Sequence, residues 1–153
     1  DPPPASFSYP MGARQESPGH PHSHDSGIEN AYCCIASNAR DFARLAKLYK
    51  NHGRWEGKVL LDSKFISKSI TPRFEESPQY GYSWWLKNYK GHEVFMNRGH
   101  LGQYVLTFPK ENLILVLLGH TKGPNGNTDD PFTPDIYHYM DIALELNPDA
   151  NTP

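Results

Sequence analysis

One short stretch of the sequence combines residue types that could line an active site. It reads Arg98-Gly99-His100-Leu101-Gly102-Gln103-Tyr104 and lies between two segments with a strand-like pattern, 93–97 and 104–108. Glycines at the end of a strand let a backbone come close to a ligand. A histidine there can donate or accept a hydrogen bond near neutral pH. We therefore expect this stretch to form one wall of a site.

The chemistry that such a wall could supply is stabilisation of an oxyanion. This requires backbone N–H groups aimed at the developing charge, with no side chain in the way. We expect His100 and the backbone at Gly102 and Gln103 to form this catalytic edge, and Arg98 and Tyr104 to contact the substrate. A histidine at the mouth of a strand is more often structural than catalytic, so the motif alone is weak.

A complete catalytic set is absent from the sequence. A serine nucleophile needs a base within reach, and Ser-x-x-Lys provides one a helical turn away. No serine is followed by lysine at that spacing; Ser37 with Arg40 comes nearest, and an arginine is no base at neutral pH. Gly-x-Ser-x-Gly, Cys-x-x-Cys, His-Glu-x-x-His and a phosphate-binding glycine loop are also missing. We expect no cofactor.

Composition gives no support to several other classes of protein. The chain has 153 residues and a net charge of −2, without a basic patch, which gives no support to nucleic-acid binding. The long apolar run, Leu113 to Leu118, is too short to span a bilayer. Adjacent Cys33 and Cys34 imply no disulfide framework and suit a short buried strand at 30–36.

Three histidines near the N-terminus raise the question of a metal site. His20, His22 and His24 could hold a transition metal, because imidazole suits zinc, copper or nickel. The prolines among them favour an exposed loop with adventitious metal binding at most. We therefore predict no metal site.

Hydrophobic periodicity predicts an α+β fold, with an antiparallel meander flanked by helices. Ser37 and Asp62 are the expected helix N-caps, Gly53 is the expected C′ residue of the first helix, and Leu45 is expected on its buried face. The helices are predicted at 38–52, 63–70 and 135–146, and the strands at 80–87, 93–97, 103–108 and 113–120.

Several segments together resemble the C-terminal half of the serine β-lactamase-related hydrolases. This family includes class C β-lactamases, DD-peptidases, esterases and 6-aminohexanoate-dimer hydrolases, many of them bacterial. The similarity is ordered from about residue 27 to 120. It rests on segments 27–34, 39–45, 53–58 and 80–86 and on Gly99-His100-Leu101-Gly102-Gln103-Tyr104, with a looser match at 9–12.

The resemblance implies roles and an organisation. His100 and Gly102 match the family's His-x-Gly motif, and Gln103 would lend its N–H to the oxyanion hole. The family's Ser-x-x-Lys and Tyr-x-Asn motifs are expected upstream of this chain, in a missing N-terminal half that also supplies strands to the sheet. Without that half, an edge of the sheet would be exposed. The domain plan is a loop or linker at 1–26, the C-terminal part of a β-lactamase-like domain at 27–146, and a frayed tail at 147–153.

Two interpretations of function follow. In the first, the chain is part of a serine hydrolase that cleaves a small amide or ester through an acyl-enzyme. In the second, it is a non-catalytic scaffold or interaction module that has lost the nucleophile. By itself the chain is expected to be inactive. The resemblance suggests a periplasmic or extracytoplasmic setting, and neither substrate nor oligomeric state follows from the sequence.

Overall fold

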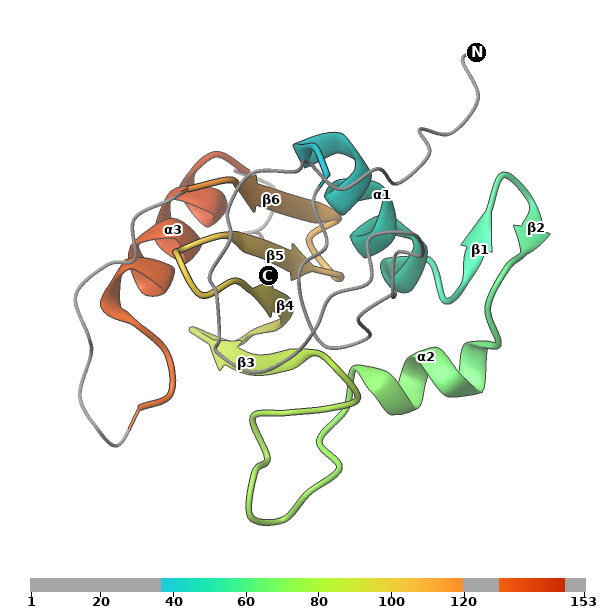
Figure 1. Ribbon diagram of the computed structural model, residues 1–153, viewed down its shortest axis with the longest axis horizontal. Coiled ribbons are helices and arrows are strands. Elements are labelled where there is room, and N and C mark those ends of the chain that lie inside the picture. The colour runs from blue at the N-terminus through green and yellow to red at the C-terminus, as the bar shows by residue number, and fades with distance from the viewer. Residues whose placement is uncertain (1–36, 120–129, 148–153) are drawn as a thin grey trace, which may run out of the picture. The chain divides into compact units, whose positions relative to one another are not determined.

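The computed structural model describes residues 37–119 and 130–147 (Figure 1). The chain divides into two units, Asp1–Asn38 and Ala39–Pro153, and the second holds all of the described helices and strands. No described helix has the length and apolar character needed to cross a membrane. Three predictions lie outside the described residues: the domain boundary after residue 26, the strand at 30–36, and the histidine cluster at 20–24.

An antiparallel sheet forms the centre of the second unit, which confirms the predicted α+β class. Its strands pair in chain order, as a meander does. They are β3 (Trp85–Tyr89), β4 (His92–Arg98), β5 (Tyr104–Phe108) and β6 (Leu113–Leu117). The other elements are α1 (Ala39–Lys50), the small hairpin of β1 (Arg54–Trp55) and β2 (Lys58–Val59), α2 (Ser63–Ser69) and α3 (Pro134–Glu145).

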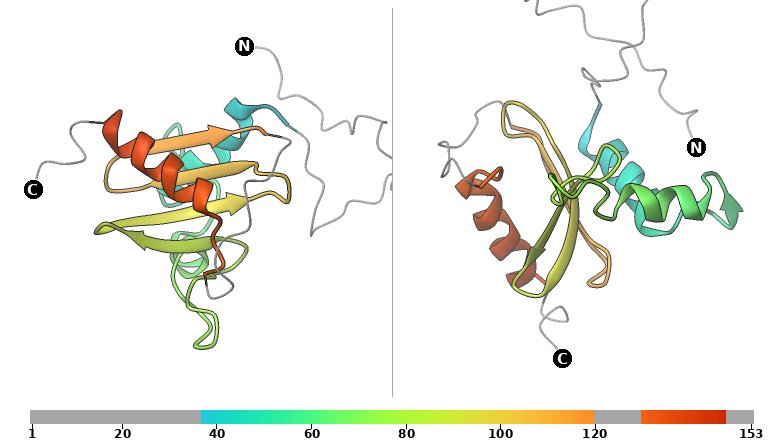
Figure 2. Two further views of the ribbon diagram at one scale, coloured as in Figure 1. Left: turned by 90° about the vertical axis from the view of Figure 1, so that its left-hand side faces the viewer. Right: turned by 90° about the horizontal axis from the view of Figure 1, so that it is seen from below.

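Helices cover both faces of the sheet (Figure 2). On one face α3 packs against β4 and β5, and the buried side chains from the sheet and helix form one core. These side chains are Val94, Met96, Tyr104, Leu106, Phe108, Ile136, Met140, Ala143 and Leu144. On the other face α1 contacts β5 and β6, and Trp84, Leu86 and Phe95 form a second cluster against Tyr49. Every residue of β5 is buried as a result.

The ends of α1 differ slightly from the prediction. The helix begins at Ala39, so Asn38 rather than Ser37 immediately precedes it. At the other end, the N–H of Gly53 donates to the Leu48 carbonyl at 2.9 Å, and the N–H of His52 donates to Tyr49 at 3.0 Å. This is a Schellman motif in which His52, with φ of 53°, is the C′ residue and the glycine follows it. The prediction of Gly53 at C′ was therefore one residue late.

The buried face of α1 departs from the prediction at Leu45. Its side chain is 40% exposed, whereas Ala46, which the same helical spacing places on this face, is fully buried. Leu45 therefore lies at the exposed edge of the apolar stripe with which α1 contacts β5 and β6. The second helix, in contrast, starts as predicted, because the Asp62 carboxylate accepts the Phe65 N–H at 2.8 Å.

Two strand predictions need correction. The first strand begins at Trp85 rather than Tyr80, because Ser83 takes a φ of 67° and the Gly81 N–H bonds the Trp84 carbonyl, which makes a turn. The last strand was expected at 113–120, but β6 ends at Leu117, and it is half-buried throughout. It pairs only with β5 among the described strands, so one of its edges has no described neighbour.

Glycine at position 53 can be tested by a matched pair of substitutions. A Cβ on Gly53 would lie 2.2 Å from the Leu61 carbonyl oxygen, whereas a Cβ on Gly57 would meet no atom within 4 Å. Both residues have positive φ, 81° and 79°. We expect Gly57→Ala to destabilise by about 1 kcal/mol, because only the left-handed backbone opposes it. Gly53→Ala should cost roughly 1–3 kcal/mol more from overpacking. Equal costs in urea unfolding would show that the contact with Leu61 relaxes freely.

A polar contact fastens α3 to the hairpin between β3 and β4. The Tyr89 hydroxyl donates to Asp141 Oδ1 at 2.9 Å, and Lys90 Nζ lies 2.6 Å from the same oxygen. Hydrogen bonds from Lys90 and Tyr89 hold the pKa of the Asp141 carboxyl below its usual value. The ionised carboxylate is thereby favoured in the folded state.

This contact predicts a pH-dependent loss of stability. Because the pKa of Asp141 is depressed on folding, its contribution is present above the ordinary carboxyl pKa and disappears as the pH falls through the folded pKa. Asp141→Asn should therefore lower the free energy of unfolding at neutral pH and make little difference in strong acid. Glu145→Gln is the control, because Glu145 is on the same helix and makes no ion pair with a described residue. Parallel pH profiles for Asp141→Asn and the unaltered chain would contradict the assignment.

Candidate active-site loop

The loop that joins β4 to β5, Gly99–Gln103, contains the residues that the sequence singled out. The Gly99 N–H donates to the Gln103 carbonyl at 2.7 Å, which closes the loop at the end of the two strands. Gly102 has φ of 80° and is buried, so a side chain at this position would be strained. The left-handed backbone conformation at position 102 therefore favours the glycine found there.

The side chain of Gln103 holds the loop in place. Its Nε2 donates to the Gly119 carbonyl at 2.5 Å, and its Oε1 accepts the Leu101 N–H at 3.1 Å. Residue 119 follows β6, so one amide connects the loop to the far edge of the sheet. A Cβ on Gly99 would lie 2.3 Å from Oε1 of this amide, which explains glycine at position 99.

Three backbone donors of the loop have no acceptor in the part of the chain that the structure describes. The N–H groups of His100, Gly102 and Gln103 donate to no acceptor within the described parts of the chain. His100 itself is exposed, and Leu101 beside it is 45% exposed. The imidazole of His100 is therefore accessible to a molecule outside the loop, whereas Gly102 is buried. The catalytic roles predicted for these residues stay predictions.

Arg98, at the end of β4, lies between aromatic rings. Its guanidinium carbon is 4.5 Å from the Trp85 ring centroid and 5.1 Å from that of Phe132. Burial lowers the pKa of this guanidinium, although nearby Tyr104 and Asp130 oppose the change. Nε and Nη1 are buried and have no hydrogen-bond partner among residues 37–119 and 130–147. The predicted contact between Arg98 and substrate stays a prediction, but the side chain has donors left for one.

Tyr104 occupies a different environment from the rest of the loop. It is 3% exposed, and its hydroxyl lies 2.9 Å from Asp135 Oδ2 and 3.1 Å from Thr133 Oγ1. Burial raises the pKa of the phenol. These contacts attach the start of α3 to β5 and give Tyr104 a structural role. Its predicted contact with substrate has no further support in this geometry.

The sequence contains one match to the Tyr-x-Asn pattern that was not identified above. Tyr49-Lys50-Asn51 has the letters Tyr-x-Asn, which we expected only upstream of the chain. The Tyr49 ring packs against Trp84 at a centroid distance of 4.6 Å, and Lys50 Nζ bonds Asn112 Oδ1 at 2.6 Å. Asn112 lies in the turn between β5 and β6, at the opposite end of β5 from the Gly99–Gln103 loop. The match therefore does not belong to the candidate site.

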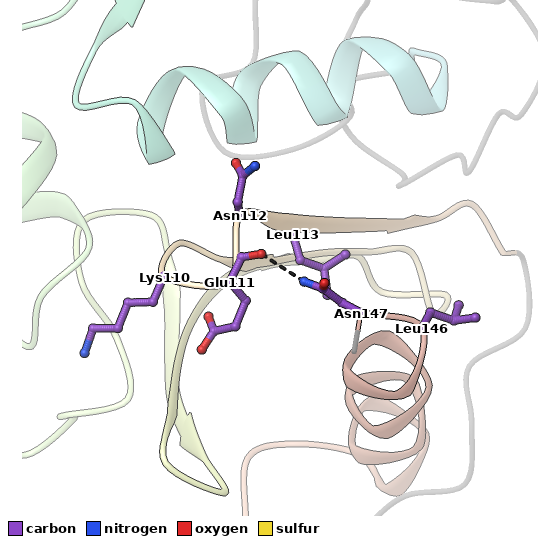
Figure 3. Close-up of a pocket in the computed structure, with 6 residues that line it drawn as sticks. All are labelled: Lys110, Glu111, Asn112, Leu113, Leu146 and Asn147. Atoms are coloured by element: carbon purple, nitrogen blue, oxygen red, sulfur yellow. Dashed lines mark hydrogen bonds between the residues drawn. The ribbon is translucent and has the colours of Figure 1, made fainter. Parts of the chain in front are cut away.

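The same distant end of the sheet carries a cavity of about 520 Å³ (Figure 3). Its lining comes from the turn between β5 and β6 and from the end of α3: Lys110, Glu111, Asn112, Leu113, Leu146 and Asn147. The Asn147 side chain donates to the Glu111 carbonyl at 2.9 Å across it. None of these residues was predicted to be functional, and none lies in the Gly99–Gln103 loop. Cavity size alone therefore does not identify the candidate site.

Sequence reasoning missed the partners that shape the site. Trp85 and Phe132 flank Arg98, and Gly119 receives the Gln103 amide. Two sequence features could have pointed to the partners of Arg98: the aromatic run at the start of β3 and the Asp130-Pro131-Phe132 sequence ahead of α3. Neither feature, however, indicates a contact with β4. In the described parts of the chain, no three His, Cys, Asp or Glu residues group as a metal site.

Comparisons with known proteins give the class of fold. No protein-family model matches the chain, and no curated protein matches it. Eleven chains of solved structures do match. One is named "Putative 6-aminohexanoate-dimer hydrolase from Bacillus anthracis", with 25% sequence identity and a TM-score of 0.53. The match covers 71% of this chain but only 29% of that one. This chain is therefore similar to part of a hydrolase with a β-lactamase-like fold.

The role of the Gln103 amide can be tested directly. Gln103→Ala removes both of its hydrogen bonds, each worth about 1 kcal/mol. We expect the Leu101 amide to exchange with deuterium faster, because its acceptor is gone. Amides within β4 and β5 should exchange as before. Asn88→Ala serves as the control, because Asn88 lies on β3 opposite Glu93, at the end of β4 that is far from the loop. Unchanged exchange at Leu101 would mean that the loop keeps its shape without the amide.

Proposed function

We propose that this chain supplies one wall and the oxyanion-binding edge of a serine hydrolase that cleaves small amides or esters. The observation that carries the proposal is its similarity, at 25% identity, to part of a protein named as a hydrolase. The Gly99–Gln103 loop, with its unbonded N–H groups, supports it. The nucleophile and its base come from polypeptide other than these 153 residues, because no Ser-x-x-Lys occurs among them.

The reaction proceeds through two acyl transfers. The serine oxygen attacks the substrate carbonyl, the C–N or C–O bond breaks, and the amine or alcohol leaves with a proton. Water then attacks the acyl-enzyme and releases the acid and the free serine. In both steps the backbone N–H of Gln103 stabilises the oxyanion, Gly102 keeps the approach open, and His100 hydrogen-bonds beside the nucleophile.

The remaining part of the hydrolase joins the sheet at β6. This strand, Leu113–Leu117, is entirely apolar and half-buried, and β5 is its only partner among the described strands. An unpaired apolar edge is a template for another strand. Adding a strand there would satisfy the free backbone groups of β6 and cover its exposed surface. Whether the added strand belongs to the same polypeptide or to a separate one is part of the test.

Capture of the native protein tests the proposal. Source cells are treated with a fluorophosphonate probe, antibodies against this chain then isolate the protein, and mass spectrometry identifies every captured polypeptide. We expect a probe-labelled serine within Ser-x-x-Lys, on the same polypeptide or on one that co-purifies. An unlabelled species of 17.4 kDa, alone, would overturn the proposal and favour the alternative of a non-catalytic module.

Replacement of His100 tests the assigned site within that protein. His100→Ala should slow phosphonylation of the serine by the probe roughly 100-fold, as losses of groups in such sites do. The fold should be preserved, because His100 is exposed. His138→Ala is the matched control, since His138 is an exposed histidine on α3, away from the loop. Phosphonylation at an unchanged rate in His100→Ala would remove His100 from the site.

A further inference from the structure

The charges of the chain are unevenly distributed. Residues 39–73, which contain α1, the hairpin of β1 and β2, and α2, include nine basic and three acidic residues, a net charge of +6. The rest of the chain includes six basic and fourteen acidic residues, a net charge of −8. The small total of −2 therefore conceals a strongly basic segment, and the expectation of no basic patch is corrected for residues 39–73. Such asymmetry is typical of chains that bind an anionic surface.

Most basic side chains of this segment face solvent without a carboxylate partner. Lys50 is half-buried, and the other eight are exposed. Among residues 37–119 and 130–147, Arg44 is the one member of the set that forms an ion pair, with Asp41 at 2.8 Å. The attraction of the other eight for an external anion is therefore not neutralised by a carboxylate in contact with them. The nine residues are Arg40, Arg44, Lys47, Lys50, Arg54, Lys58, Lys64, Lys68 and Arg73.

Apolar side chains are exposed on the same segment. Val59 and Leu60 are 61% and 57% exposed where the hairpin leads into α2, and Phe65 is 48% exposed on α2. The hairpin register pairs Val59 with Arg54, so an apolar and a basic side chain lie on the same face. On α2, Phe65 and Lys68 are three residues apart and are neighbours on the helix surface. Basic and apolar side chains are therefore interleaved.

The elements of the basic segment lie together on one side of the sheet. The right-hand view of Figure 2 shows α1, the hairpin and α2 on the side opposite to α3. Ala46 of α1 and Ile66 of α2 are fully buried, so each helix keeps one face inward and presents another to solvent. The segment includes no residue of the Gly99–Gln103 loop. Its exposed side chains therefore form a surface separate from the candidate active-site loop.

We propose that residues 39–73 bind the surface of an anionic phospholipid bilayer. The lysines and arginines are attracted to the negative headgroups, while Val59, Leu60 and Phe65 enter the boundary between headgroups and acyl chains. The exposed aliphatic side chains favour a bilayer over nucleic acid, because phosphates and bases are bound by cations, hydrogen bonds and stacking on aromatic rings. The inference goes beyond the proposed hydrolase and does not depend on it.

Co-sedimentation of the 153-residue chain with lipid vesicles tests the proposal. Vesicles of phosphatidylcholine that contain about 30% phosphatidylglycerol are compared with vesicles of phosphatidylcholine alone. We expect the anionic vesicles to bind the chain about 10-fold more tightly or better. Binding should weaken between about 0.1 M and about 1 M salt, because the Debye length falls from about 10 Å to about 3 Å. Equal binding to the two kinds of vesicle, or no binding to either, would overturn the proposal.

Paired substitutions locate the charges that bind. Lys64→Gln combined with Lys68→Gln should weaken binding to anionic vesicles about 10-fold or more, since each basic side chain near the surface contributes roughly 5-fold. Lys90→Gln combined with Lys110→Gln is the matched control. It removes the same charge from lysines whose side chains are 60% and 67% exposed and lie outside the segment. Circular dichroism checks that both variants fold. An equal loss of binding in the two variants would show that only net charge matters and contradict the proposal.

A third substitution tests the apolar contribution. Leu60→Ser should weaken vesicle binding about 10-fold, because the leucine side chain no longer leaves water on binding. Leu146→Ser is its control, since Leu146 is 74% exposed and follows α3. Vesicle binding that is unchanged by Leu60→Ser would show that the segment binds any polyanion, such as a DNA duplex, and would overturn the assignment of a bilayer.

The native protein tests the other possible occupant of this surface, which is the remaining part of the proposed hydrolase. We expect the captured native protein to bind anionic vesicles as the 153-residue chain does. If the remaining part covers the segment, the native protein will not bind these vesicles, and the proposal is overturned. Labelling by the fluorophosphonate probe is a separate readout. Its absence would refute the hydrolase, whereas vesicle binding would still give its own answer.

Discussion

The burial of β5 on both of its faces is the constraint on which this structure depends. Each of its residues is inaccessible, with α3 on one face and α1 on the other. A strand buried in this way needs its register fixed, since a shift of one residue would exchange the residues that face the two helices. The same strand starts at the Gly99–Gln103 loop, so the packing that stabilises the sheet also sets the position of the loop.

Much of the fold could be predicted because it is encoded locally. Asp62 caps α2, and apolar and aromatic runs separated by short turns place the strands of the meander. The errors have local causes as well. The segment from Tyr80 to Trp84 has the aromatic residues of a strand, but the left-handed conformation of Ser83 turns it. Leu45 was assigned to the core by helical spacing, which places it and Ala46 on one face and cannot reveal that Leu45 lies at the exposed edge of that face.

The site was less accessible to prediction, because its defining contacts join distant segments. The loop residues and their glycines could be identified from their types and spacing. The amide of Gln103 reaches Gly119, and Arg98 meets Phe132, which follows it by 34 positions. No periodic pattern in the sequence predicts either contact. Tyr104 shows the opposite difficulty, because its place beside the loop suggested contact with substrate, whereas its side chain is buried in the core beside α3.

The contact between Gly99 and Gln103 constrains the order in which this loop could change. A side chain at position 99 would collide with the Gln103 amide, which two hydrogen bonds keep in place. The Cβ of Gln103 would also lie 2.9 Å from that added side chain, so glycine 99 can be replaced at low cost only if the backbone shifts or position 103 is itself a glycine. The dependence runs one way: position 103 can change while position 99 stays glycine, but a side chain at position 99 requires a change at position 103.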